Sequence, residues 1–159
     1  MNGKVRKGRK MRKRLIIGMS GASGAPLTIE LLKQLQQYKE IIETHLIVTK
    51  GAEMTLEQLY ALADEVHDNY NIGAGPASGS YRTMGMIVIP CSMKTLAGIV
   101  SGYSDNLVLR AADITLKERR KKISLPENGL SRYGNLSNNR CLCWQEYIMI
   151  IWKRNSLWK

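Results

Sequence analysis

Small polar residues recur at three places where an apolar run of the sequence ends. Ser20–Ser23 follow the first run, Thr49 closes the second, and Cys91–Thr95 follow the third. Each place lies at or near the predicted start of a helix, where free N–H groups and the helix dipole favour an anion. Taken singly, each hydroxyl is better explained as a helix cap. Together they favour a ligand with a phosphate and a flat ring, with contacts from Ser23, Thr49, Ser92, Lys94 and Thr95.

The first of these places is a loop of small residues, Gly18 to Pro26, with glycines spaced Gly18-x-x-Gly21-x-x-Gly24. This spacing matches neither the dinucleotide fingerprint nor the P-loop, which ends in Gly-Lys-Ser/Thr. Pro26 suits the first turn of a helix, because its missing N–H has no intrahelical partner there. The loop alone is equally compatible with tight packing of a strand against a helix and with phosphate binding.

The elements that must position these residues alternate between strand and helix. The apolar patterns predict strands at residues 15–17, 44–49 and 86–90, the last ended by Pro90. They predict helices at residues 27–38, 52–63, 91–102 and 107–120, the last capped by Asp105 or Asn106. A long polar loop is predicted from His67 to Arg82. Residues 123–125 are at best a weak strand. This alternation predicts an α/β fold with a doubly wound parallel sheet, in which ligands bind at the carboxyl ends of the strands.

The net charge of +11 comes from the two ends of the chain. Residues 1–14 carry eight basic residues and no acidic one, whereas residues 15–120 carry nine basic and eleven acidic residues. A terminal basic block is typical of a solvated arm, so neither a nucleic-acid partner nor a membrane is expected. We therefore divide the chain into a basic disordered leader (1–13), an α/β domain (14–121) and a tail of unknown structure (122–159).

The three cysteines and two histidines do not predict a catalytic or metal site. The cysteines form no disulfide framework and no Cys-x-x-Cys pair, which favours the reducing cytoplasm. Cys91 has no evident base, because His45 falls in a predicted strand and His67 in a predicted loop. We expect Cys91 to be a small buried apolar residue, and we expect no metal.

Five segments of the chain resemble the UbiX/Pad-type flavin prenyltransferases, which are flavodoxin-like, doubly wound flavoproteins. The segments lie in family order over residues 13–121: Gly18–Ala25, Glu43–Lys50, Pro76–Ser80, Ile89–Ala97 and Arg110–Arg120. The resemblance implies transfer of a dimethylallyl group from dimethylallyl phosphate to N5 and C6 of reduced FMN. It also implies delivery of prenylated FMN to a UbiD-type decarboxylase of phenolic acids, and a homo-oligomer, commonly a dodecamer.

The resemblance also assigns site residues. Gly21, Ala22 and Ser23 match the first FMN-binding segment, and Thr49 matches a position that is commonly Ser in the family. The third FMN-binding segment is matched by four consecutive residues, Ser92, Met93, Lys94 and Thr95. Ser23 is expected beside the reacting flavin atoms. An acidic residue is expected in the following helix, and Glu57 is the candidate, with Glu53 as the alternative.

The chain departs from the family after Arg120. The family continues with a strand and an Arg-Glu-Thr-Pro-type motif, and later supplies a Tyr and a basic residue that hold the prenyl phosphate. Residues 122–159 match none of these, as the product of a shifted reading frame would. The sheet is therefore expected to be incomplete at its C-terminal end. Two alternatives to the prenyltransferase stay open: a non-catalytic FMN-binding remnant and an FMN-dependent cysteine decarboxylase of the same group.

Overall fold

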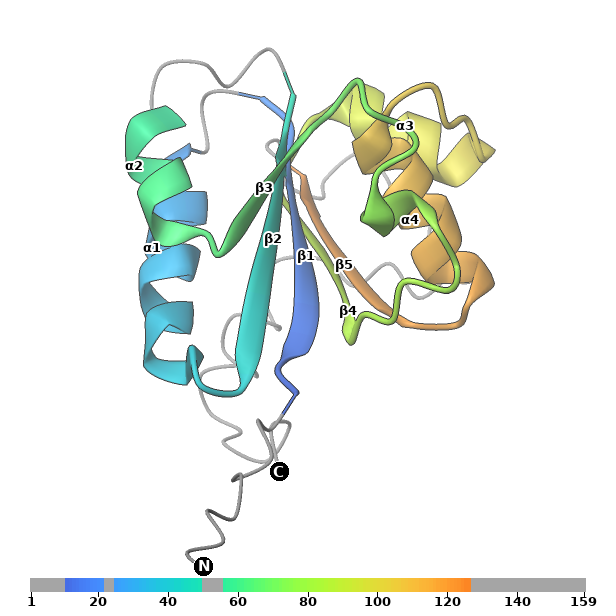
Figure 1. Ribbon diagram of the computed structural model, residues 1–159. Helices are drawn as coiled ribbons and strands as arrows, with labels where there is room; N and C mark the ends of the chain where they lie inside the picture. Colours follow the sequence, from blue (N-terminus) through green and yellow to red (C-terminus); the bar gives the residue numbers. More distant parts are fainter. Residues whose placement is uncertain (1–10, 22–24, 50–55, 127–159) are drawn as a thin grey trace, which may run out of the picture.

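The computed structural model describes residues 11–21, 25–49 and 56–126, and these form one parallel sheet covered by helices on both faces (Figure 1). The strand order is β3-β2-β1-β4-β5. The strands are β1 (Lys13–Met19), β2 (Ile42–Val48), β3 (Glu65–Asp68), β4 (Gly85–Cys91) and β5 (Lys121–Pro126). The helices are α1 (Ala25–Leu35), α2 (Leu56–Leu62), α3 (Met93–Ser101) and α4 (Leu107–Lys117), with 3-10 turns η1 (Gln36–Tyr38) and η3 (Gly75–Ala77). The predicted fold class is confirmed.

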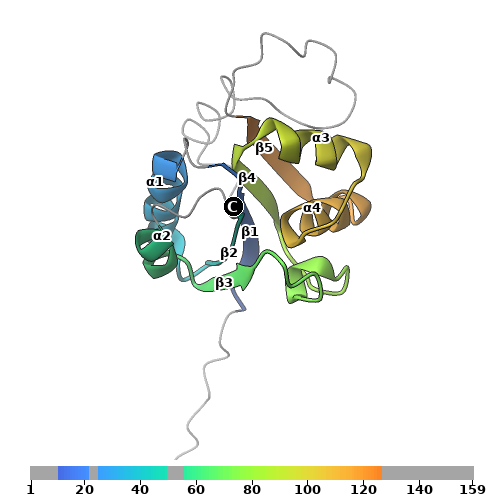
Figure 2. The same cartoon turned by 90° about the horizontal axis from the view of Figure 1, so that it is seen from above.

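The strand β1 occupies the centre of the sheet because both of its faces are apolar. Leu15, Ile17 and Met19 face the layer formed by α1 and α2. Ile16 points to the opposite layer, formed by α3 and α4. Viewed from above, the two helix pairs lie on opposite sides of the sheet (Figure 2). A strand buried on both faces needs a continuous apolar run, which is the pattern found here.

The direction of winding reverses beside β1. The chain passes from β1 to β2 and β3 on one side, then crosses to β4 and β5 on the other. The reversal places a switch point between β1 and β4, where ligands bind in folds of this type. Gly18 allows the close packing at this point, because a Cβ there would lie 3.1 Å from Cε of Met86.

The sequence patterns did not predict the strand β3 and predicted only the middle of β5, as at best a weak strand. The loop predicted from His67 to Arg82 is wrong at its start, since His67 belongs to β3, which pairs with β2. Residues 123–125, predicted to be at best a weak strand, lie within β5, which spans Lys121–Pro126 and pairs with β4. The sheet therefore continues five residues beyond position 121. Pro90 does not end β4, which runs on to Cys91 with a register shift after Val88.

Two asparagine side chains, one buried and one half-buried, fix the N-terminus of α4. Asn106 caps the helix, accepting a hydrogen bond from the Leu109 amide (3.1 Å), as one of the two predicted caps. Asn69, from the loop after β3, accepts from the amides of Leu107 and Val108 through its backbone and side-chain oxygens (2.8 and 3.1 Å). These bonds satisfy three amides of the first turn of α4, which have no partner within the helix.

Arg120 ties the loop before β4 to the end of α4. Its guanidinium donates to the carbonyl oxygens of Gly79 (2.7 Å) and Tyr81 (2.8 Å) and to the hydroxyl of Thr83 (3.2 Å). Charged donors make the stronger hydrogen bonds, so this one side chain holds a long connection in place. None of the helices in the described residues has the length and apolar character of a membrane span.

Candidate functional site at the carboxyl edge of the sheet

The carboxyl ends of β1, β2 and β4 meet at one edge of the sheet. The amide of Thr49, just after β2, donates to the carbonyl of Met19 at the end of β1 (2.9 Å). The amide of Ser20, just after β1, donates to the carbonyl of Pro90 in β4 (3.0 Å). Three segments that are distant in sequence are therefore held side by side at the switch point.

Ser20 joins β1 to the start of α3. Its buried hydroxyl accepts a hydrogen bond from the Ser92 amide (3.0 Å) and donates to the Pro90 carbonyl (3.4 Å). From the sequence, Ser23 was expected to contribute its hydroxyl to a ligand, whereas the Ser20 hydroxyl is used in this link between segments. Because the link sets the position of the α3 N-terminus relative to the β1 loop, Ser20 is a positioning residue of the site.

The α3 N-terminus combines a helix cap with positive charge that favours an anion. Ser92 caps the helix, because its hydroxyl accepts from the Thr95 amide (3.2 Å) and donates to the Thr95 hydroxyl (3.0 Å). Thr95 is buried, Met93 packs against the apolar layer under α3, and Lys94 is exposed. The cap explains the Ser92 hydroxyl without a ligand. The positive end of the helix dipole and the Lys94 ammonium still favour an anion here.

The structure brings together most of the predicted binding residues. Gly21, Thr49 and the segment Ser92–Thr95 all lie at the carboxyl edge. Gly21 has φ 101°, a backbone conformation that favours glycine. Ala22 and Ser23 fall outside the described residues.

Of the two candidate acidic residues, Glu57 and Glu53, the structure describes only Glu57. Glu57 is exposed in the first turn of α2, and its role stays a prediction. Glu53, its alternative, falls outside the described residues. Cys91 is fully buried in the layer beneath α3 and α4, as expected for a small apolar residue.

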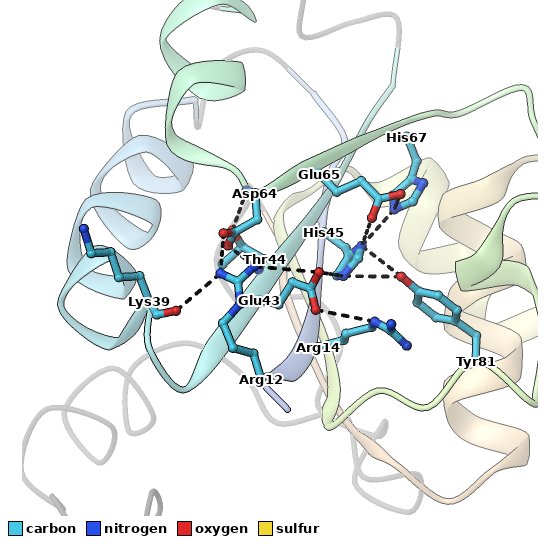
Figure 3. Close-up of polar contacts among 10 residues, drawn as sticks. All are labelled: Arg12, Arg14, Lys39, Glu43, Thr44, His45, Asp64, Glu65, His67 and Tyr81. Atoms are coloured by element: carbon cyan, nitrogen blue, oxygen red, sulfur yellow. Dashed lines mark hydrogen bonds and ion pairs between the residues drawn. The ribbon is translucent and has the colours of Figure 1, made fainter. Parts of the chain in front are cut away.

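A second polar group, formed by His45, Glu65 and His67, was not predicted from the sequence, because His67 was expected to lie in a loop. In the structure His67 lies in β3, directly beside β2, and its Nε2 is 3.0 Å from Nδ1 of His45 (Figure 3). Burial lowers the pKa of both imidazoles, so both are neutral near pH 7. One feature of the sequence could have indicated this group: Glu65 and His67 are two positions apart, so in a strand both side chains lie on the same face.

Comparisons with known proteins agree with this architecture. The family model described as Flavoprotein matches residues 4–140. A probable UbiX-like flavin prenyltransferase of Sedimentibacter hydroxybenzoicus is 50% identical over 121 residues, covering 71% of this chain and 64% of that protein. The chain thus spans less than two thirds of the length of this relative.

Two solved structures are similar to the chain in both sequence and fold. A dodecameric FMN-dependent UbiX-like decarboxylase from Escherichia coli O157:H7 is 50% identical, with a TM-score of 0.70, covering 75% of this chain and 69% of that one. AnUbiX (PadA1), in complex with FMN and dimethylallyl pyrophosphate, is 44% identical, with a TM-score of 0.69 and coverage of 77% and 69%.

Proposed function

Because the chain belongs to the flavoprotein family and, within it, to the UbiX-like flavin prenyltransferases, we propose that it binds FMN at the carboxyl edge of β1, β2 and β4 and prenylates it. One observation carries this proposal. The segments that match the FMN-binding motifs of the family end three different strands, and they meet at the switch point of the sheet.

The donor set at this edge fits a flavin phosphate. The α3 N-terminus and Lys94 supply positive charge, and Gly21 adds a turn without a side chain. A planar ring needs walls without bulky side chains, and the small residues that end β1 meet that need. We therefore assign FMN binding to Gly21, Ala22, Ser23, Thr49, Ser92, Met93, Lys94 and Thr95.

Each part of the chain would have a separate task in the transfer. Bound reduced FMN supplies the nucleophilic N5 and C6 atoms that take the dimethylallyl group from dimethylallyl phosphate. Ser92 and Thr95 hold the first turn of α3 in shape, so that its amides point at an anion without reorganisation. Ser23 is proposed beside the ring and Glu57 as the acidic partner. No metal is needed in this scheme, since proximity and fixed positive charge act on the leaving phosphate.

The C-terminal departure favours a second candidate, FMN binding without prenyl transfer. The residues that hold the prenyl phosphate in the family are not recognisable in residues 122–159 of the sequence. The cysteine-decarboxylase alternative has less support, because Pro76–Ser80 and Pro90–Ser92 match the prenyltransferase motifs. If transfer occurs, we propose a cytoplasmic homo-oligomer, such as a dodecamer, that supplies prenylated FMN to a UbiD-type decarboxylase.

Titration of the purified full chain with FMN, followed by the quenching of flavin fluorescence, tests the binding step. Lys94→Ala should weaken binding, whereas Lys33→Ala, which removes an exposed charge from the far end of α1, should not. Anaerobic reduction with dithionite and addition of dimethylallyl phosphate then tests transfer. The mass of prenylated FMN supports the first candidate, and bound but unmodified FMN supports the second. If wild-type protein leaves the fluorescence of FMN unchanged, both candidates are wrong.

A further inference from the structure

The only two histidines of the chain meet on adjacent strands, together with a carboxylate (Figure 3). His45 comes from β2, whereas Glu65 and His67 come from β3. The parallel register pairs His45 directly with Glu65, and His67 lies two residues further along β3 on the same face. Two imidazoles and a carboxylate are the ligand types that Zn²⁺ takes in proteins.

The spacing of the three donors suits a single metal ion. Nδ1 of His45 lies 3.0 Å from Nε2 of His67 and 3.4 Å from Oε2 of Glu65. Nε2 of His67 lies 3.6 Å from Oε1 of Glu65. Tetrahedral zinc with bonds of about 2.0–2.1 Å places its donors about 3.3–3.4 Å apart. The three observed separations bracket that value, the two to Glu65 being measured to its two different carboxylate oxygens.

Several polar atoms surround the ring of His45 at short range. Three polar atoms approach its Nδ1: Nε2 of His67 (3.0 Å), the hydroxyl of Tyr81 (3.2 Å) and Oε2 of Glu65 (3.4 Å). A ring nitrogen has either one proton or one lone pair, so it makes one good hydrogen bond. His45 is nevertheless completely buried. Several donors that converge on one point are expected of a metal site.

The surroundings of His45 supply a second layer of interactions. Its other nitrogen, Nε2, lies 3.9 Å from Oε1 of Glu43, and the second oxygen of Glu43 lies 3.6 Å from Nε of Arg14. The hydroxyl of Tyr81 lies closer to Nε2 of His45, at 3.3 Å, and a hydrogen bond to the non-ligating nitrogen commonly orients a histidine ligand.

We propose that Nδ1 of His45, Nε2 of His67 and the carboxylate of Glu65 bind one Zn²⁺, with the fourth position open to water. The site differs from the flavin edge, because His45 precedes Thr49 by four residues, or about 13 Å along a strand. Its effect would be structural. The strand β3 is only four residues long and lies at the sheet edge, and zinc would fasten it to β2.

Zinc titration of the full chain, stripped with EDTA and desalted, against a chromophoric chelator tests the proposal. One Zn²⁺ per chain is expected, with a higher melting temperature on binding. Glu65→Gln should weaken binding at least about 10-fold and His67→Gln at least about 100-fold, given that losing even an indirect partner costs 10- to 100-fold. Glu30→Gln is the control, an exposed carboxylate on α1.

Cobalt separates this site from one built on cysteine. Co²⁺ bound by the histidines should give tetrahedral visible bands without thiolate-to-cobalt charge transfer in the near ultraviolet. Glu65 is half exposed, so its variant should keep the wild-type circular dichroism spectrum. Wild-type protein that binds no zinc, variants that bind as tightly as wild type, or a strong thiolate charge-transfer band would each overturn the proposal.

Discussion

The link between Ser20 and Ser92 gives a quantitative prediction for Ser20→Ala. The substitution removes the only side-chain acceptor that the described structure offers to the Ser92 amide, while it changes the packed volume little. Ser92 is half-buried, and a buried amide left without a partner costs about 1–3 kcal/mol. With a urea dependence of about 1–3 kcal/mol per molar for a domain of this size, the unfolding midpoint should fall by roughly 1 M. The variant should also bind FMN more weakly, because the α3 N-terminus loses its attachment to β1.

Urea unfolding followed by circular dichroism measures the first effect, and flavin fluorescence measures the second. The matched control is Ser101→Ala, whose hydroxyl donates only to the Gly98 carbonyl within α3 (3.2 Å) and is far from the site edge. The control should change stability by less than about 0.5 kcal/mol. If Ser20→Ala unfolds at the same urea concentration as Ser101→Ala, the inferred role of Ser20 is refuted. A loss of stability with unchanged FMN affinity would restrict that role to folding.

Three further predictions concern stability. Burial alone would raise the pKa of Asp64, but hydrogen bonds from Thr44 and Arg12 outweigh it and lower the pKa. The wild-type urea midpoint should therefore fall as pH drops below about 4, and fall less in Asp64→Asn; equal falls would contradict this. Arg120→Ala should lower the free energy of unfolding, measured in urea, by about 2 kcal/mol, because three hydrogen bonds are lost. Arg110→Ala, at an exposed arginine, should leave it almost unchanged. The Ser124 hydroxyl is buried without a partner in the described chain, so Ser124→Ala should raise or preserve the melting temperature, and a fall would argue against this.

Local patterns were sufficient where each segment carries its own signal. The apolar runs of β1, β2 and β4 predicted buried strands, and the structure confirms them. Asn106 was one of two caps predicted from residue type, and Thr49, Ser92, Lys94 and Thr95 were placed at the ligand edge by type and position, whereas Gly21 and Met93 came from the family resemblance. The comparisons confirmed the family resemblance. It could be recognised from the sequence because several motifs in one order are far more specific than a single glycine loop.

Only the tertiary structure decided the features that depend on pairing between distant segments. The strand β3 has exposed, charged residues and no apolar run, so its extended conformation comes from hydrogen bonding to β2. For the same reason, β5 became a strand only through its pairing with β4. Once β3 is placed, His67 meets His45 and a candidate metal site arises. The sequence determined which segments are buried, whereas the order of the strands determined which side chains meet, because ladder pairing is not encoded within either segment alone.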